Sequence, residues 1–173
     1  MGRPLLSKVP LTPSRPPAEP RGKHFDEFEI GERTVSPGRT VTEADVVAFA
    51  GLSGDWNPLH TDEEFARRTP FRRRIAHGML LNAIATGLGS QTGLFDGTTV
   101  ALLEMVIRYR DPVFFGDTVR LELTVAEKRE TSSPRRGVVV FETIVRNQRG
   151  EAVVEGQWVV LMKRRASARA GVS

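Results

Sequence analysis

The sequence predicts an α+β fold in which an antiparallel sheet curves around one buried helix. Residues 79–89 are apolar on nearly every face of a helix, and a helix of that kind is buried. After Gly97 the apolar positions alternate, as they do over residues 119–125, and this alternation is typical of strands. Short turns between consecutive strands imply antiparallel pairing. Any face of the helix that the sheet leaves uncovered requires a second subunit, so we expect a homodimer or a larger homo-oligomer.

The chain of 173 residues suits one domain with a core of its own. Residues 1–23 hold six of the eleven prolines and predict a Pro-rich basic tail without a core. The predicted domain covers residues 24–163, and residues 164–173 form a second basic tail. We see no internal repeat.

The basic character of the chain is confined to its two ends. The net charge is +4 over residues 1–24 and +4 over residues 163–173, whereas the residues between them carry net −4. A nucleic-acid-binding domain carries its basic residues on the folded surface, so the sequence predicts no nucleic-acid partner.

Composition also limits the compartment and the cofactors. The chain has no cysteine and three histidines, which excludes a cysteine-based metal site and argues against a multi-histidine one. No apolar run reaches about 18 residues, so we expect no membrane span. The N-terminus lacks the apolar stretch of a secretory signal, and a cytoplasmic protein is the default expectation.

The elements that precede the buried helix follow from local signals. Thr42 is a candidate N-cap with Asp45 at the third helical position, and Gly51 and Gly54 weaken and stop that helix. Pro58 keeps Asn57 out of helical geometry. In chain order the prediction is an extended segment over 32–41 broken at residues 37–38, a helix from 42 to about 53, a loop over 54–61 and a short helix over 62–68.

Four later segments are rich in valine, aromatic residues and threonine, as strands are. They cover residues 100–110, 117–126, 137–146 and 152–162. Residues 147–150 read Asn-Gln-Arg-Gly and are a candidate hairpin turn.

One short loop carries a carboxylate and an imidazole five residues apart, Asp55 and His60. The Asn57-Pro58 turn between them can fold the two side chains toward each other. Such a pair can hold one water molecule, accept a proton from it and deliver a proton elsewhere. Hydration of an activated alkene needs both transfers.

The start of the buried helix supplies the complementary group. The first turn of a helix presents unpaired N–H groups at the positive end of its dipole, and Gly78 has no side chain to keep a carbonyl oxygen away. An N–H aimed at the enolate oxygen of a thioester contributes about 3–4 kcal/mol to the transition state. The three residues together form a complete site for hydration of an enoyl thioester.

Each residue also has a simpler explanation. Asp55 is a turn residue by type, and His60 alone reads as a surface histidine. Gly78 alone reads as a helix-packing glycine, and Thr86 as a helical threonine bonded to a preceding carbonyl.

The combination of motifs resembles a known family. The loop Gly54-Asp-Trp-Asn-Pro-Leu-His60, followed by His77-Gly78-Met79 at the buried helix, is similar to the MaoC-like dehydratases, which include the (R)-specific enoyl-CoA hydratases. The resemblance covers about residues 25–163 and includes Asp111-Pro-Val-Phe-Phe-Gly-Asp117, which looks like the family's entry into a strand.

The resemblance implies the hotdog fold and the reversible hydration of trans-2-enoyl-CoA to (R)-3-hydroxyacyl-CoA, without metal or other cofactor. It implies that Asp55 and His60 orient and activate water and that Gly78 N–H binds the thioester oxygen. Thr86 stands where relatives carry a serine near the catalytic region, and Asn57 looks like a structural member of the loop.

His77 lies next to the implied site, where we favour a histidine bonded to backbone over a proton-transfer role. The substrate is an acyl-CoA or its acyl-carrier-protein counterpart, and phosphates favour arginines at the tunnel mouth. Five candidates are Arg72, Arg73, Arg74, Arg135 and Arg136, although ordinary solvated charge explains any single one.

Three alternatives stay open. The first is an acyl-CoA thioesterase on the same fold, whose site does not require the Asp-x-Asn-Pro-Leu-His loop. The second is a non-catalytic acyl-CoA-binding module, which needs no proton-transfer pair. The third is nucleic-acid binding through the two tails.

Overall fold

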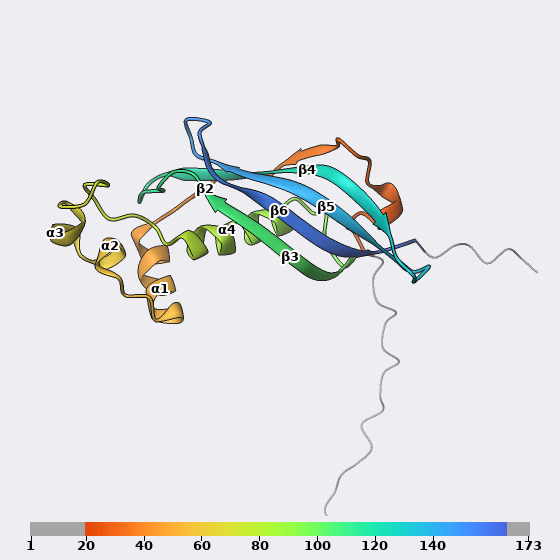
Figure 1. Ribbon diagram of the computed structural model, residues 1–173, viewed down its shortest axis with the longest axis horizontal. Coiled ribbons are helices and arrows are strands. Elements are labelled where there is room, and N and C mark those ends of the chain that lie inside the picture. Colours follow the sequence, from red (N-terminus) through yellow and green to blue (C-terminus); the bar gives the residue numbers. More distant parts are fainter. Residues whose placement is uncertain (1–19, 166–173) are drawn as a thin grey trace, which may run out of the picture.

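The computed structural model describes residues 20–165, so most of the predicted N-terminal tail and residues 166–173 lie outside the described residues. Figure 1 shows a curved sheet with the long helix α4 (Gly78–Gln91) lying across one face. The predicted α+β architecture is therefore confirmed. The helices α1, α2 and α3 lie beyond the end of the sheet at which α4 begins (Figure 1).

The sheet has the order β1-β4-β5-β6-β3, with β2 paired to β4, and neighbouring strands run antiparallel. The strands are β1 (Arg33–Val35), β2 (Arg39–Thr40), β3 (Thr99–Tyr109), β4 (Thr118–Glu130), β5 (Arg136–Arg146) and β6 (Ala152–Lys163). A 3-10 turn, η1 (Phe25–Glu27), precedes β1. In the described part of the chain, β3 is an edge strand that pairs with β6 alone.

The alternation in β4 separates the two faces of the sheet, as the sequence predicts. Val119, Leu121, Leu123 and Val125 are buried and belong to the same core as the inner residues of α4. The residues between them point to the outer face. Phe141 on β5 is fully buried and packs edge-on against two further phenylalanine rings.

The sheet covers α4 on most sides and leaves one side uncovered, which is the arrangement that the sequence analysis allows for by expecting a second subunit. Leu80, Leu81, Ile84 and Leu88 face the core, but Met79 is 60% exposed. Ala83 and Thr86 are also exposed, which gives a stripe at helical spacing. A single subunit thus covers the helix on the sheet side and leaves this stripe open.

The segment that leads to the site begins with α1 (Glu43–Ser53). Thr42 caps this helix and accepts a hydrogen bond from Asp45 N, as predicted. Gly54 ends it at φ +77°, a left-handed conformation that glycine adopts without a steric cost. The chain therefore turns sharply just before Asp55.

Two short helices follow. The predicted loop over residues 54–61 is wrong in its second half, because α2 (Pro58–Thr61) is helical. Pro58 occupies the first helical position, where its missing N–H costs nothing. The next helix, α3 (Glu63–Ala66), is shorter than predicted and is capped by Asp62.

The chain before η1 is held on the domain. Gly22 N donates to the carbonyl oxygen of Asp96, and Lys23 N donates to that of Leu94.

Among the helices of the described residues, none has both the length and the apolar character needed to cross a bilayer.

Candidate active site

The Asp55 loop is shaped by side chains that bond to their own backbone. Asp55 Oδ1 accepts a hydrogen bond from Asn57 N at 3.2 Å, and Asn57 Oδ1 accepts one from Leu59 N at 3.0 Å. Asn57 is the N-cap of α2. The two turns carry the chain from the exposed Asp55 to the buried His60 in five residues.

The orientation of the His60 ring is fixed by a backbone carbonyl. His60 Nδ1 lies 2.8 Å from the carbonyl oxygen of Ile75. Because a carbonyl oxygen only accepts, Nδ1 carries the proton, and in the neutral imidazole the lone pair is on Nε2. The ring therefore presents a basic nitrogen on the side opposite Ile75.

Burial lowers the pKa of His60, and the neighbouring His77 lowers it further. The bond to Ile75 and the negative charge of Asp55 act in the opposite direction, and the net shift is downward. His60 is therefore a neutral base at pH 7.

The structure brings Asp55, His60 and His77 together. One carboxylate oxygen of Asp55 and one ring nitrogen of each histidine all lie within 4.8 Å of one another. The two imidazole rings are stacked, with centroids 3.8 Å apart and an interplanar angle of 30°. His60 Nδ1 and His77 Nε2 each lie beside a backbone carbonyl oxygen, so each of these two nitrogens carries a proton and has no lone pair for a metal ion.

A cavity of about 340 Å³ joins His60 to the start of α4. Its walls include Gly78, Leu81 and Tyr109, and residues 110–113 also line it. No side chain caps the first turn of α4, so its N–H groups keep their capacity to bind an anionic oxygen. The cavity thus connects the predicted base with the predicted oxyanion donor.

The ring of Tyr109 leaves no space for a side chain at position 78, which is a second requirement for glycine there. A Cβ placed on Gly78 would lie 2.6 Å from Cζ of Tyr109 and 2.8 Å from Cε1, which is a direct clash with the ring. The residue pattern predicts a glycine here for the close approach of a substrate, and it gives no sign of the contact with Tyr109. Nothing in the alternation of β3 marks this residue as part of a site.

We expect Gly78→Ala to lower kcat by about 10-fold or more, because the tyrosine ring must move and the amide beside it shifts with it. The control is Gly87→Ala on the same helix, where an added Cβ meets no atom within 4 Å. That variant should keep its activity and gain about 1 kcal/mol of helix stability. Steady-state kinetics and urea unfolding of both proteins check the prediction, which is contradicted by equal kcat values.

The predicted arginines are divided between two regions. Arg74 bonds Glu43 at 2.6 Å and Glu63 at 3.2 Å, so its charge is already paired. Arg72 and Arg73 are exposed, and the guanidinium of Arg73 stacks on Phe114, 3.7 Å from the ring centre.

Arg135 and Arg136 lie at the other end of the sheet. Arg136 on β5 pairs with Lys163 at one end of β6. Val154, at the other end of β6, pairs with Tyr109 of β3 beside the site. Nine residues of β5 separate Arg136 from the site end, about 30 Å of strand. The structure does not bring these two arginines to the site of their own subunit.

Thr86 is also separate from the cluster in its own chain. It follows Gly78 by eight residues, about 12 Å along the helix axis. Its Oγ1 donates to the carbonyl oxygen of Ala83 at 2.8 Å, the helical arrangement that the sequence analysis gives as the simpler explanation. Thr86 lines a different, apolar pocket of about 230 Å³ with Leu102 and Trp158.

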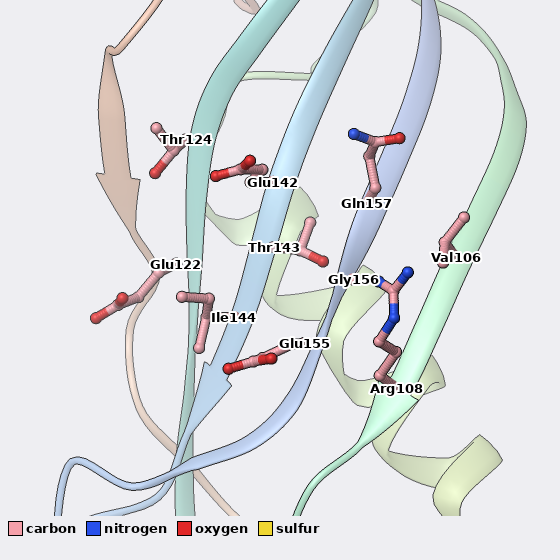
Figure 2. Close-up of a pocket in the computed structure, with 10 residues that line it drawn as sticks. All are labelled: Val106, Arg108, Glu122, Thr124, Glu142, Thr143, Ile144, Glu155, Gly156 and Gln157. Carbon is pink, nitrogen blue, oxygen red and sulfur yellow. The ribbon is translucent and has the colours of Figure 1, made fainter.

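A polar cavity of about 320 Å³ lies on the outer face of the sheet (Figure 2). Figure 2 shows Glu122, Glu142 and Glu155 on this face, with α4 behind the strands. Glu122 is paired with Arg33 at 2.7 Å and with Arg146 at 3.1 Å. None of the predicted site residues lines this cavity, so the sheet separates it from the cluster around His60.

The fold and the cluster define a class of protein, a hotdog domain with a carboxylate and an imidazole at the mouth of its central helix. Comparison with known proteins supports this class. The MaoC like domain model matches residues 27–147. A Mycobacterium tuberculosis protein described as having a double hotdog fold superposes with a TM-score of 0.75 over 87% of this chain and 47% of that chain. It is 19% identical, so it supports the fold alone.

Two curated relatives cover most of the chain. The (R)-specific enoyl-CoA hydratase of Aeromonas caviae is 39% identical over 133 residues, 77% of this chain and 94% of the relative. The enzyme of the same name from Rhodospirillum rubrum is 34% identical over 143 residues, 82% of this chain and 93% of the relative. The chain belongs to the MaoC-like dehydratase family. The expectation that it is a lyase is confirmed by these relatives.

Proposed function

We propose that the protein catalyses the reversible hydration of a trans-2-enoyl-CoA to the (R)-3-hydroxyacyl-CoA. The observation that carries this proposal is the convergence of the Asp55 carboxylate and a His60 ring whose Nδ1 is bonded to Ile75. That bond leaves Nε2 as the basic atom. The names of the two hydratase relatives support the choice of substrate and the stereochemistry.

The mechanism uses one water molecule held by the pair. His60 Nε2 removes a proton from the water, which the Asp55 carboxylate also holds, and the water oxygen bonds to C3 of the substrate. The electrons of the C2–C3 double bond move to the thioester oxygen, which becomes an enolate bound by Gly78 N–H. The enolate then collapses and C2 receives a proton from the pair, so the product is the substrate plus one water.

Arg72 and Arg73 are our candidates for the phosphates of coenzyme A. Both are exposed and follow Phe71, which lines the cavity with His60. Arg74 is a weaker candidate because two carboxylates already pair with it. An acidic acyl carrier protein would contact the same arginines. The cytoplasmic location of this protein remains a prediction.

The experiment is incubation of the purified full chain with crotonyl-CoA. Hydration removes the absorbance of the conjugated thioester without releasing free thiol, and chiral chromatography should find the (R) product. Release of free thiol would instead identify a thioesterase. No reaction with thioesters from C4 to C12 would leave a binding module and contradict the proposal.

The pH profile follows from the state of His60. Because burial holds the pKa of His60 below its ordinary value of 6.5, more than half of the base is neutral at pH 6.5, and it is lost as pH falls through the lowered pKa. We expect the acid decline of kcat/KM to have its midpoint below pH 6.5. A midpoint above pH 6.5 in the free enzyme would contradict a buried neutral base.

We further propose that the protein is at least a homodimer formed through β3 and the exposed stripe of α4. Val100, Leu102 and Leu103 are 38%, 47% and 55% exposed, and they lie on a strand whose outer edge is unpaired in the described residues. An open apolar edge is a template for a second strand. Light scattering should give twice the chain mass, and Leu103→Glu should shift it toward the monomer; a wild-type monomer at micromolar concentration contradicts this.

A further inference from the structure

His77 is the most enclosed member of the cluster and contacts several elements at once. It directly precedes α4, and its side chain is 2% exposed. One side of its ring stacks on His60 of α2, and Phe49 of α1 lies 5.1 Å from it. Its Nε2 lies 2.9 Å from the carbonyl oxygen of Asp55.

These contacts identify the tautomer of His77. A carbonyl oxygen accepts, so Nε2 is the donor and carries the proton. The other nitrogen, Nδ1, is buried and has no hydrogen-bond partner among residues 20–165. The neutral ring of His77 is therefore held as the Nε2–H tautomer, with its lone pair on Nδ1.

The segment Ile75-Ala76-His77 holds both members of the proposed pair. The Ile75 carbonyl accepts from the His60 ring, while the His77 ring donates to the Asp55 backbone. The segment is itself anchored, because Ala76 N donates to the carbonyl oxygen of Val113 at 2.8 Å. The next residue is the proposed oxyanion donor, so one short stretch sets three positions in the site.

We propose that His77 is a positioning residue for the hydration: its Nε2–H fixes the backbone of Asp55, and its ring supports the imidazole of His60. The inference rests on the proposed function and adds the device that keeps the pair converged. A proton-transfer role does not fit, because Nε2 is engaged with a carbonyl oxygen and Nδ1 is enclosed.

The charged neighbours of this pair of rings are few. Asp55 faces the histidines from the loop after α1, and α1 itself contributes the apolar ring of Phe49. Tyr109, Arg110 and Asp111 line the cavity that contains His60, and Arg110 is paired with Glu155 at 2.8 Å.

The test compares two replacements of similar volume. His77→Gln retains an amide N–H that can reach the Asp55 carbonyl, whereas His77→Leu retains the packing without the donor. We expect His77→Leu to lower kcat by about 10- to 100-fold, because small misplacements of reacting groups have effects of that size. KM should change by less than about 3-fold, and His77→Gln should recover most of the loss.

The decisive readout is the same change made in an Asp55→Asn background. If His77 acts by placing Asp55, His77→Leu should reduce kcat there by less than about 3-fold. An equal fold-loss in both backgrounds, or equal deficits for the glutamine and leucine variants, would overturn the proposal. If His77→Leu does not fold, the glutamine variant in both backgrounds supplies the same comparison, and a full 10-fold loss in each overturns it.

A spectroscopic measurement on the wild-type protein is independent of turnover. Ring nitrogen chemical shifts in ¹⁵N-labelled protein at pH 8 should show His77 as the Nε2–H tautomer. The Nδ1–H tautomer would overturn the inference even if the protein hydrates crotonyl-CoA. Absence of all hydration with this tautomer intact would instead defeat the proposed function alone.

Discussion

Asp55→Asn should reduce kcat for enoyl-CoA hydration by about 10²- to 10⁴-fold while leaving the fold intact. The amide keeps an oxygen that can accept the hydrogen bond from Asn57 N, so the turn is preserved. The amide has no negative charge to hold the water or to stabilise the imidazolium that forms when His60 takes the proton. Stopped-flow or steady-state assays with crotonyl-CoA measure the effect, and circular dichroism checks the fold.

The matched control is Asp62→Asn, seven residues along the same segment. Asp62 caps α3 through Phe65 N, and asparagine is an equally good cap, so activity and stability should both stay near wild type. A loss of similar size in the two variants, or an active Asp55→Asn protein, would show that the carboxylate of Asp55 is not part of the chemistry.

His60→Asn should produce a loss of the same order, about 10²- to 10⁴-fold in kcat. The asparagine amide N–H can replace the bond from Nδ1 to the Ile75 carbonyl, so the local structure has a substitute donor. No group then stands where Nε2 stood, and the water has lost its neutral base. The acid decline of kcat/KM that belongs to His60 should disappear from the residual activity.

His24→Asn is the control for the removal of a histidine. His24 lies before η1 and bonds Glu27, away from the cluster at the start of α4. We expect its kcat to remain within about 2-fold of wild type. If His60→Asn retains wild-type kcat and its full pH profile, another residue supplies the base.

Most of the fold could be predicted from local patterns, because period and caps are local properties. The alternation over residues 119–125 and the Thr42 cap both correspond to observed elements. The exposure of Met79 and Thr86 could not be predicted in this way. Which side of an apolar helix the sheet covers depends on the registers of distant strands, and composition does not contain that information.

The residue pattern selects candidate site residues, but it does not reveal the groups that hold them in place. Asp55, His60 and Gly78 are marked by residue type and spacing. The Ile75 carbonyl and the Tyr109 ring carry no such mark, because a backbone oxygen has no sequence signal and Tyr109 reads as an ordinary strand residue. Arg135 and Arg136 are selected for their positive charge. Charge in the sequence does not indicate which end of a strand lies at the site, and these two arginines lie at the other end.

The most direct test of the shared water is the double-mutant cycle of Asp55→Asn and His60→Asn. Two groups that act on one molecule of water form a unit. Once the first residue has been replaced, replacing the second therefore causes little further loss of kcat. We predict that the double variant loses about as much kcat as the poorer single variant, within about 5-fold. A loss equal to the product of the two single losses would show that Asp55 and His60 act independently, and would contradict the account.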